Sequence, residues 1–142
     1  MENAYIRKVQ YHETDRMGIT HHSNYIKWME EARIDFLDKA GYSYARLEAE
    51  GILSPVIGVE CSYKHPTTFD DTVRIVVGVE AFKGARLTIR YEMTNAATGD
   101  LVLTGRTMHC FTGATGRPIL LKKKCPALAE LFEQMAPAAQ PE

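Results

Sequence analysis

The feature that most constrains this sequence is a helical stretch from Asn24 to about Ala40 with a broad apolar surface. Its apolar residues recur at the spacing of an α-helix, at Tyr25, Trp28, Met29, Ala32 and Phe36. Ile26, Ile34 and Leu37 widen that stripe. Because one flat neighbour cannot cover so wide an apolar surface, the helix has to be enclosed by other structure. We therefore predict a long helix wrapped by the rest of the chain.

Most of the remaining chain has the pattern of strands. The alternation is clearest where Leu87, Ile89, Tyr91 and Met93 occupy every second position, which indicates an antiparallel strand with one wet face. One long helix followed by consecutive strands predicts an α+β fold, with the helix packed on an antiparallel sheet. The predicted strands cover residues 5–11, 54–64, 72–82, 86–94 and 101–111, and two short helices cover 44–50 and 127–135.

Length and composition favour a single domain. The chain has 142 residues, of which 45% are hydrophobic, enough for one core of its own. We expect that domain to cover residues 1–135 and the stretch 136–142, APAAQPE, to be a flexible tail. No stretch approaches the roughly 18 apolar residues of a membrane span, and no basic start precedes an apolar run. The sequence is therefore expected to belong to a soluble, cytoplasmic protein.

Charge and cysteine content exclude several kinds of partner. The net charge is −1, with 17 basic and 18 acidic residues, so nucleic acid is an unlikely ligand and any anion must meet a local basic cluster. Cys61, Cys110 and Cys125 are widely spaced and odd in number. That spacing fits neither a disulfide framework nor the close cysteine pairs of a zinc site.

The densest group of reactive side chains lies just before the long helix. The first N–H groups of a helix have no internal partner and carry the positive end of its dipole, so they would stabilise a developing oxyanion. A carboxylate in the preceding loop could then act as a general base or a nucleophile. The group consists of Tyr11, His12, Glu13, Asp15, His21 and His22.

On spacing alone, two other interpretations of Asp15 stay open. It could be an ordinary turn residue, because Asp is common in loops ahead of a glycine. It could also bind a metal with His12, His21 and His22, although no pair of histidines has the i, i+4 spacing of a helical metal site. Metal binding is the less favoured of these interpretations.

Charged residues outside this group have simple structural explanations. Glu30 and Arg33 stand three apart on the helix, where they could form a side-chain ion pair or be partly buried and orient the loop. Arg86, Arg90 and residues 122–124 are most simply solvent-facing charges. A phosphate-rich ligand would need some of these groups, together with Lys64 or Lys83.

The order and spacing of the residues around Asp15 resemble a known signature. The run from Tyr11 to Ile19, YHETDRMGI, is followed by His22, by Asn24-Tyr25 and by residues 30–33, EEAR. This pattern is similar to that of the 4-hydroxybenzoyl-CoA thioesterase family, and within it to the small bacterial acyl-CoA thioesterases associated with the Tol-Pal system. The resemblance implies a hot-dog fold, in which a curved antiparallel sheet wraps one long helix. It also implies homodimers, often paired into homotetramers, with the acyl-CoA site between subunits.

The resemblance assigns roles to particular residues. Asp15 matches the catalytic aspartate of the family, His22 the helix-start residue whose backbone N–H polarises the carbonyl, and Tyr11 a tyrosine that orients the aspartate. Gly18 gives the loop the backbone freedom to turn toward the helix. Glu30 and Arg33 are expected to support the loop and the oxyanion site. Substrate contacts are expected from Met17, Trp28 and Tyr63, and contacts with the CoA phosphates from Lys64, Arg86 and Arg90.

The reaction implied is hydrolysis of a CoA thioester to a free acid and CoA, without a metal or a redox cofactor. A hot-dog hydratase or dehydratase of enoyl or hydroxyacyl thioesters is an alternative, since His and carboxylate side chains would serve it as acid and base. A non-catalytic acyl-CoA binding module is another. The loop that contains Asp15 and Gly18 favours hydrolysis over both.

Overall fold

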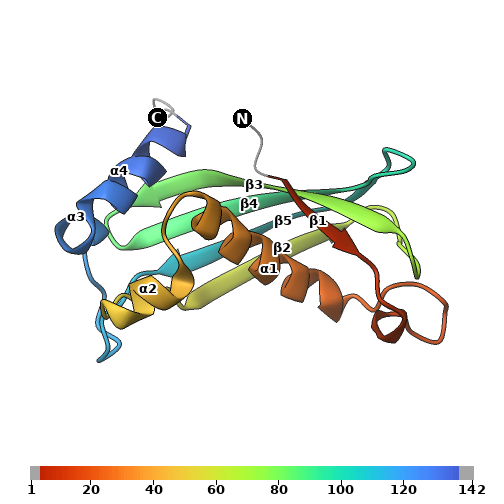
Figure 1. The fold of residues 1–142 in the computed structure, drawn as a ribbon, viewed down its shortest axis with the longest axis horizontal. Helices are drawn as coiled ribbons and strands as arrows, with labels where there is room; N and C mark the ends of the chain where they lie inside the picture. The colour runs from red at the N-terminus through yellow and green to blue at the C-terminus, as the bar shows by residue number, and fades with distance from the viewer. Residues whose placement is uncertain (1–3, 138–142) are drawn as a thin grey trace.

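The computed structural model describes residues 4–137, which form one antiparallel sheet and a set of helices (Figure 1). The sheet has five strands in the order β1-β3-β4-β5-β2. The strands are β1 (Ala4–Lys8), β2 (Val56–Tyr63), β3 (Thr72–Lys83), β4 (Arg86–Asn95) and β5 (Leu101–Cys110). The helices are η1 (Tyr11–Glu13), α1 (Ser23–Lys39), α2 (Tyr44–Ala49), α3 (Leu121–Lys124) and α4 (Pro126–Met135).

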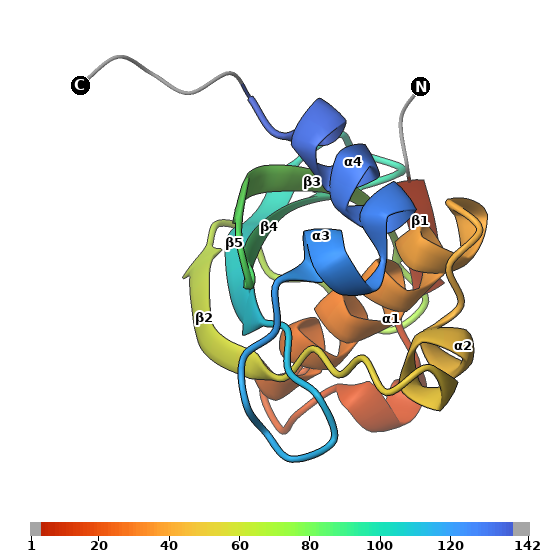
Figure 2. The same cartoon turned by 90° about the vertical axis from the view of Figure 1, so that its left-hand side faces the viewer.

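The sheet curves around α1, as Figure 2 shows, and this confirms the predicted α+β fold with a wrapped helix. Trp28, Met29 and Ala32 of α1 are fully buried against the inner side of the sheet. The inner side of β4 supplies the four residues that alternate in the sequence, and each is at most 4% exposed. The core therefore lies between α1 and the sheet, and its apolar burial is the main source of stability.

The predicted first strand extends too far. The ladder between β1 and β3 ends at Lys8, and the chain then turns into the 3-10 helix η1. The turn is held by a side chain, since the backbone N–H of Gln10 donates to Oε1 of Glu13 over 2.8 Å. The strand was predicted from residue types alone, and these give no information on the contact between Gln10 and Glu13. The predicted tail lies mostly outside the described residues, which end at position 137.

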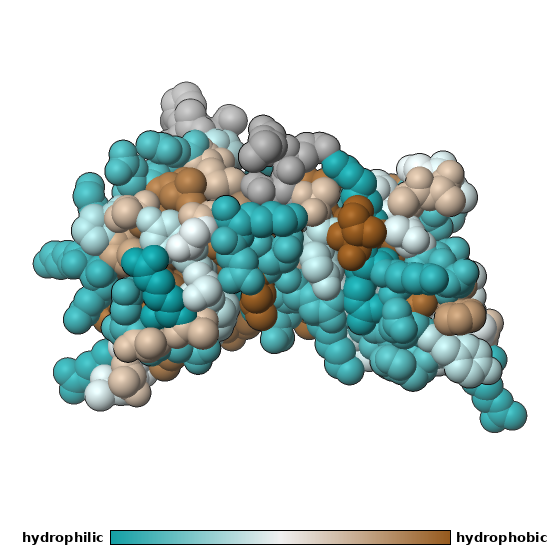
Figure 3. All heavy atoms as spheres, in the orientation of Figure 1, coloured by the Kyte–Doolittle hydropathy of each residue, from teal (hydrophilic) through white to brown (hydrophobic). Residues whose placement is uncertain are grey.

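Two strand edges of the sheet remain open. β1 pairs with β3 alone and β2 pairs with β5 alone. The β2 edge carries exposed apolar side chains, whereas the face of the molecule in Figure 3 is mostly hydrophilic with small separate apolar groups. These side chains belong to Val56, Ile57, Val59 and Tyr63.

Within residues 4–137, no helix is long and apolar enough to cross a membrane.

Candidate active site

The loop between η1 and α1 folds back on itself and places Asp15 near the start of α1. Thr14 pairs with Thr20, and the N–H of Asp15 donates to the carbonyl of Ile19 over 2.8 Å. The carboxylate of Asp15 is half-buried, and its Oδ1 accepts the N–H of Met17 over 2.8 Å. Within residues 4–137, the second oxygen, Oδ2, accepts no hydrogen bond. One oxygen is therefore held in place while the other stays available.

Gly18 makes this reversal possible. Its φ of +83° lies in the left-handed region, where a side chain would strain the backbone. Its carbonyl accepts the hydroxyl of Thr68 over 2.7 Å. The far side of the loop is anchored too, because the N–H of Thr20 donates to the carbonyl of Thr67 over 2.8 Å. The loop is thus tied to the segment between β2 and β3.

The N–H of His22, directly before α1, is not hydrogen-bonded among the described residues. The N–H of Ser23 points to Nδ1 of His21, and the N–H of Asn24 donates to the carbonyl of His21. For the N–H of His22, by contrast, no acceptor is present in the part of the chain that the structure describes. His22 is exposed and directly precedes α1, so this group lies at the positive end of the helix dipole. Such a position suits an oxygen that gains negative charge.

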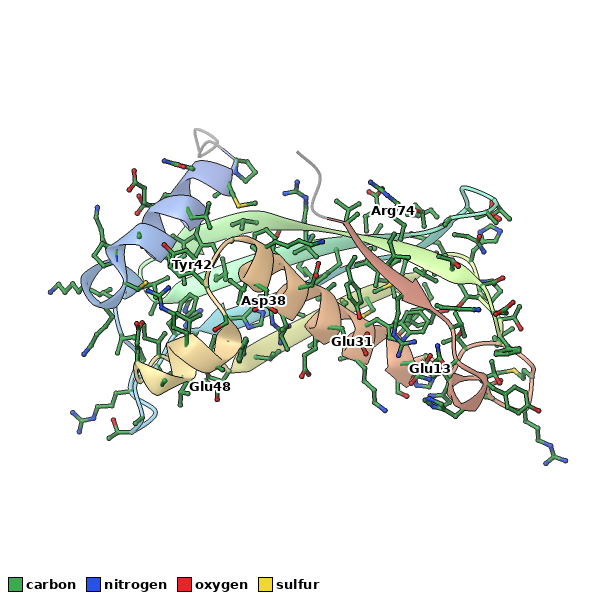
Figure 4. All side chains as sticks on the ribbon, in the orientation of Figure 1. Glu13, Glu31, Asp38, Tyr42, Glu48 and Arg74 are labelled. Atoms are coloured by element: carbon green, nitrogen blue, oxygen red, sulfur yellow. The ribbon has the colours of Figure 1, made fainter. Side chains whose placement is uncertain are left out.

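Glu13 fixes both the loop and the start of the helix. Its carboxylate is buried and receives Nη1 and Nη2 of Arg7, each over 2.8 Å, and Nε1 of Trp28 over 2.9 Å. Its backbone carbonyl accepts the N–H of His21 over 2.8 Å and the side-chain amide of Asn24 over 2.9 Å. One residue therefore joins β1, η1 and α1 around the Asp15 loop. Figure 4 shows Glu13 at that end of α1.

The pKa of Glu13 reflects this environment. Burial alone would raise it, but the hydrogen bonds from Gln10, Trp28 and Arg7 and the charge of Arg7 outweigh burial, so the pKa lies below its usual value. The carboxylate is consequently ionised at neutral pH and remains paired with Arg7. It serves as a fixed anchor rather than as a proton carrier.

Several aromatic side chains lie around the loop and the start of α1. The ring of Tyr63 lies 6.4 Å from that of His22 and 5.7 Å from that of Tyr25, between centroids. Tyr11 is 77% exposed and packs edge-on against Phe69 at 5.4 Å. Among residues 4–137, Tyr11 makes no hydrogen bond with Asp15, whose Oδ1 accepts the N–H of Met17. The side chain of Met17 is exposed on the same loop.

Other predicted site residues lie elsewhere in this chain. Trp28 is fully buried behind Glu13, which leaves it no surface for substrate within one chain. Glu30 is exposed, whereas Arg33 points into the core and its Nη1 donates to the hydroxyl of Tyr91, so the ion pair between them is not formed. Within one chain, Arg33 lies about 16 Å along the helix axis from His22.

The predicted basic residues are dispersed. Lys64 is exposed and directly follows Tyr63, whose ring lies 6.4 Å from that of His22. Arg86 lies at the turn between β3 and β4, at the opposite end of the sheet from the Asp15 loop (Figure 1). Arg90 occupies the outer face of the sheet, where its Nη1 donates to the carbonyl of Val79. Only Lys64 is close to the Asp15 loop within a single chain.

The sequence predicted no anchoring role for the residues that hold the loop in place. Glu13, Arg7 and Asn24 hold it, and Thr67 and Thr68 anchor it from a segment about fifty positions further along the chain. The one available signal was the spacing of Glu13 three residues after Gln10, which is typical of helix-capping contacts. No three His, Cys, Asp or Glu side chains of the described chain are grouped in a way that could hold a metal ion.

Comparison with known proteins agrees with this geometry. Residues 9–138 match the model of the thioesterase-like superfamily. YneP of Bacillus subtilis, named as a candidate acyl-CoA thioesterase, is 33% identical over 128 residues, which cover 89% of this chain and 92% of YneP. The crystal structure of a DHNA-CoA thioesterase from Staphylococcus aureus superposes with a TM-score of 0.89 at 34% identity, over 94% of this chain and 89% of that one.

A curved five-stranded sheet around one helix is the hot-dog fold, and the named relatives identify this chain as a thioester hydrolase. The chain belongs to the thioesterase-like superfamily, and the resemblance to 4-hydroxybenzoyl-CoA thioesterases is confirmed. A further relative, YbgC of Escherichia coli O157:H7, is named an acyl-CoA thioester hydrolase and is 28% identical over 89 residues, which cover 63% of this chain and 66% of YbgC.

Proposed function

We propose that this protein hydrolyses acyl-CoA thioesters, with Asp15 as the reacting carboxylate and the N–H of His22 as the oxyanion donor. The observation that carries the proposal is the pairing of a carboxylate with one free oxygen and an unused N–H at the helix start. The names of YneP and YbgC and of the Staphylococcus aureus structure support the substrate class. No metal and no redox cofactor are needed for this reaction.

The reaction follows from these two groups. Oδ2 of Asp15 takes a proton from a water molecule while the water oxygen attacks the thioester carbon. The carbonyl oxygen becomes negatively charged, and the N–H of His22 stabilises it together with the dipole of α1. The carbon–sulfur bond then breaks, and the CoA thiolate takes up the proton. In the alternative course Asp15 attacks the carbon itself and water cleaves the resulting anhydride.

We also propose that two copies of the chain pair through β2. This edge strand has unpaired backbone groups and four exposed apolar side chains, from 39% exposed at Val59 to 53% at Ile57. Pairing would cover them and bring residues of a second subunit toward Tyr63 and His22. The active sites would then lie between subunits of a homodimer or homotetramer. Sedimentation equilibrium tests this, and a monomer at micromolar concentration would refute it.

The substitution Asp15→Asn tests the mechanism. An amide can neither accept the proton nor attack the thioester, so thiol release should fall by at least 100-fold, the lower end of a general base's contribution. Asp38→Asn, on an exposed aspartate near the far end of α1 (Figure 4), is the matched control and should retain wild-type turnover. Short, long and aromatic acyl-CoAs form the substrate panel.

Several outcomes would argue against the proposal. Wild-type turnover in Asp15→Asn would exclude the carboxylate as the reacting group. A loss in His22→Ala as deep as that in Asp15→Asn would indicate that the imidazole takes part, since alanine keeps the backbone N–H. Hydration of crotonyl-CoA without release of thiol would indicate a hydratase instead. Background rates over the whole panel would indicate a non-catalytic acyl-CoA binding module.

A further inference from the structure

One end of the molecule gathers cations from two distant stretches of the chain. The hairpin between β3 and β4 contributes Lys83 and Arg86, which are paired in register. Residues 122–124, three consecutive lysines, form most of α3. All five side chains are exposed, and none of them forms an ion pair or a side-chain hydrogen bond with the residues that the structure describes. These five residues are the basic cluster.

Backbone contacts hold the two stretches together. The N–H of Leu121 donates to the carbonyl of Gly84 over 3.4 Å, and a Cβ atom placed on Gly84 would lie 3.6 Å from Cδ2 of Leu120. Leu121 is fully buried, so the three lysines extend from a fixed point. Figure 2 looks onto this end of the molecule, where α3 lies in front of the sheet. The basic cluster is therefore one surface.

The charge at this end differs from that of the whole chain. The chain carries a net charge of −1, but no Asp or Glu occurs in residues 81–91 or 101–129, the two stretches that meet here. Of the acids nearest along the chain, Glu80 is paired with Arg106, and Glu130 and Glu133 lie on α4. The five cations outnumber these acids, so this end of the molecule is positive.

An apolar side chain lies among these charges. Leu120, directly before α3, is 49% exposed, although its neighbour Leu121 is fully buried. An exposed leucine beside lysines suits the boundary of a lipid bilayer, because the leucine can enter between the headgroups while the long lysine side chains keep their ammonium groups at the phosphates. Nucleic acid offers phosphates too, but its backbone has no apolar layer for the leucine. The combination favours a lipid surface.

We propose that the basic cluster and Leu120 dock the protein on an anionic phospholipid bilayer. This surface lies at the end of the sheet opposite the Asp15 loop, and the proposal goes beyond the proposed reaction and does not depend on it (Figure 1). Each cation held near an anionic leaflet strengthens binding about five-fold, and the attraction falls off within a Debye length, roughly 10 Å at 0.1 M salt. Five cations therefore give binding that is reversible and that high salt abolishes.

Co-sedimentation with vesicles at pH 7 tests the proposal. The probes are vesicles of phosphatidylcholine alone and vesicles in which about 30% of the lipid is phosphatidylglycerol. The protein should bind the anionic vesicles at least ten-fold more tightly than the neutral ones, and about 0.5 M salt should release it. Replacing all three lysines of residues 122–124 by glutamine should weaken binding by about 100-fold, because each lost charge removes about five-fold.

The triple variant Lys8→Gln, Lys27→Gln, Lys39→Gln is the matched control. It removes the same total charge from exposed lysines of β1 and α1, outside the basic cluster. Its binding to anionic vesicles should fall by less than about five-fold, because exposed charges beyond a Debye length from the leaflet are screened. The comparison therefore separates the basic cluster from the net charge of the chain.

The variant Leu120→Trp reports whether this position enters the bilayer. Its fluorescence should shift to shorter wavelength with anionic vesicles and stay unchanged with neutral ones, while Trp28 is already fully buried and adds a constant signal. Neither a short DNA duplex nor free CoA, at the phosphate concentration of the vesicles, should release the protein. No binding to anionic vesicles, equal binding to neutral ones, an equal loss in both triple variants, an unshifted Leu120→Trp, or release by DNA or CoA would each overturn the proposal.

Discussion

The substitution Glu13→Gln should destabilise the protein far more than the same change at its neighbour Glu31. The carboxylate of Glu13 is 3% exposed and accepts four hydrogen bonds of 2.8–2.9 Å from Arg7, Gln10 and Trp28. Glutamine keeps one acceptor oxygen, but its NH2 group replaces the second oxygen and faces N–H donors that it cannot accept from. Since breaking a buried ion pair by removing one charge costs about 3–5 kcal/mol, we expect a loss of about 3 kcal/mol.

Glu31→Gln is the matched control, because Glu31 also binds Arg7, over 2.8 Å, but is 36% exposed (Figure 4). Solvent screens that pair, and its loss should cost about 1 kcal/mol or less. Urea unfolding at pH 7 measures both free energies, and equal m-values make the midpoints comparable. A cost below 1 kcal/mol for Glu13→Gln, or a larger cost for Glu31→Gln, would refute the role of Glu13 as the anchor of the loop.

The same comparison has a defined pH dependence. The pKa of Glu13 is lowered in the folded protein, so the carboxylate contributes its stability above its unfolded pKa of about 4.3 and loses it as pH falls through the folded value. The difference between the wild type and Glu13→Gln should therefore be full at pH 6 and shrink below about pH 4. Thiol release should also fall in Glu13→Gln, because the Asp15 loop loses its fixed position.

Two further predictions concern buried polar residues of the core. Nε2 of His109 lies 2.8 Å from Oγ1 of Thr107, and Nε of Arg33 has no hydrogen-bond partner among the described residues. Burial and the nearby charge of Arg33 lower the pKa of His109 from 6.5 to about 4, so its stabilising effect is complete above pH 6.5 and is lost toward pH 4. This amounts to on the order of 3 kcal/mol, and urea unfolding should show a flatter profile over that range in His109→Gln. Arg33→Met should raise the free energy of unfolding by about 1–4 kcal/mol at pH 7, because it replaces an unpaired buried charge with an apolar side chain; a lower urea midpoint would contradict this.

The helix and the strands were predictable because buried apolar residues recur along each of them at the spacing of that element. The apolar spacing of α1 and the alternation of β4 both report which side faces the core. Arg33 lies four residues after Met29 on that same buried side, so the spacing contained a signal for its burial, although an ion pair with Glu30 seemed the simpler expectation. Its partner Tyr91 lies 58 positions away, and local spacing carries no information on such a contact.

The site was predictable only in part. The order of Asp15, Gly18 and His22 identified the loop through family resemblance, but not the contacts that hold it. Glu13 is anchored by Arg7 of β1 and Trp28 of α1, and its role depends on burial by both elements. Lys64, Arg86 and Arg90 were grouped by charge alone, and the sheet separates Arg86 and Arg90 from the loop by position and by face.

The anchoring of Glu13 by Arg7 links the position of the Asp15 loop to the order in which the chain is synthesised. Among the strands that the structure describes, β1 pairs with β3 alone, in a register that places Tyr5 opposite Ile75. During synthesis, Arg7, Glu13 and Asp15 all emerge early, but the arginine has no fixed position until β3 has been made. A chain interrupted before residue 72 would thus contain every residue of the Asp15 loop and still lack the strand that fixes the loop in place.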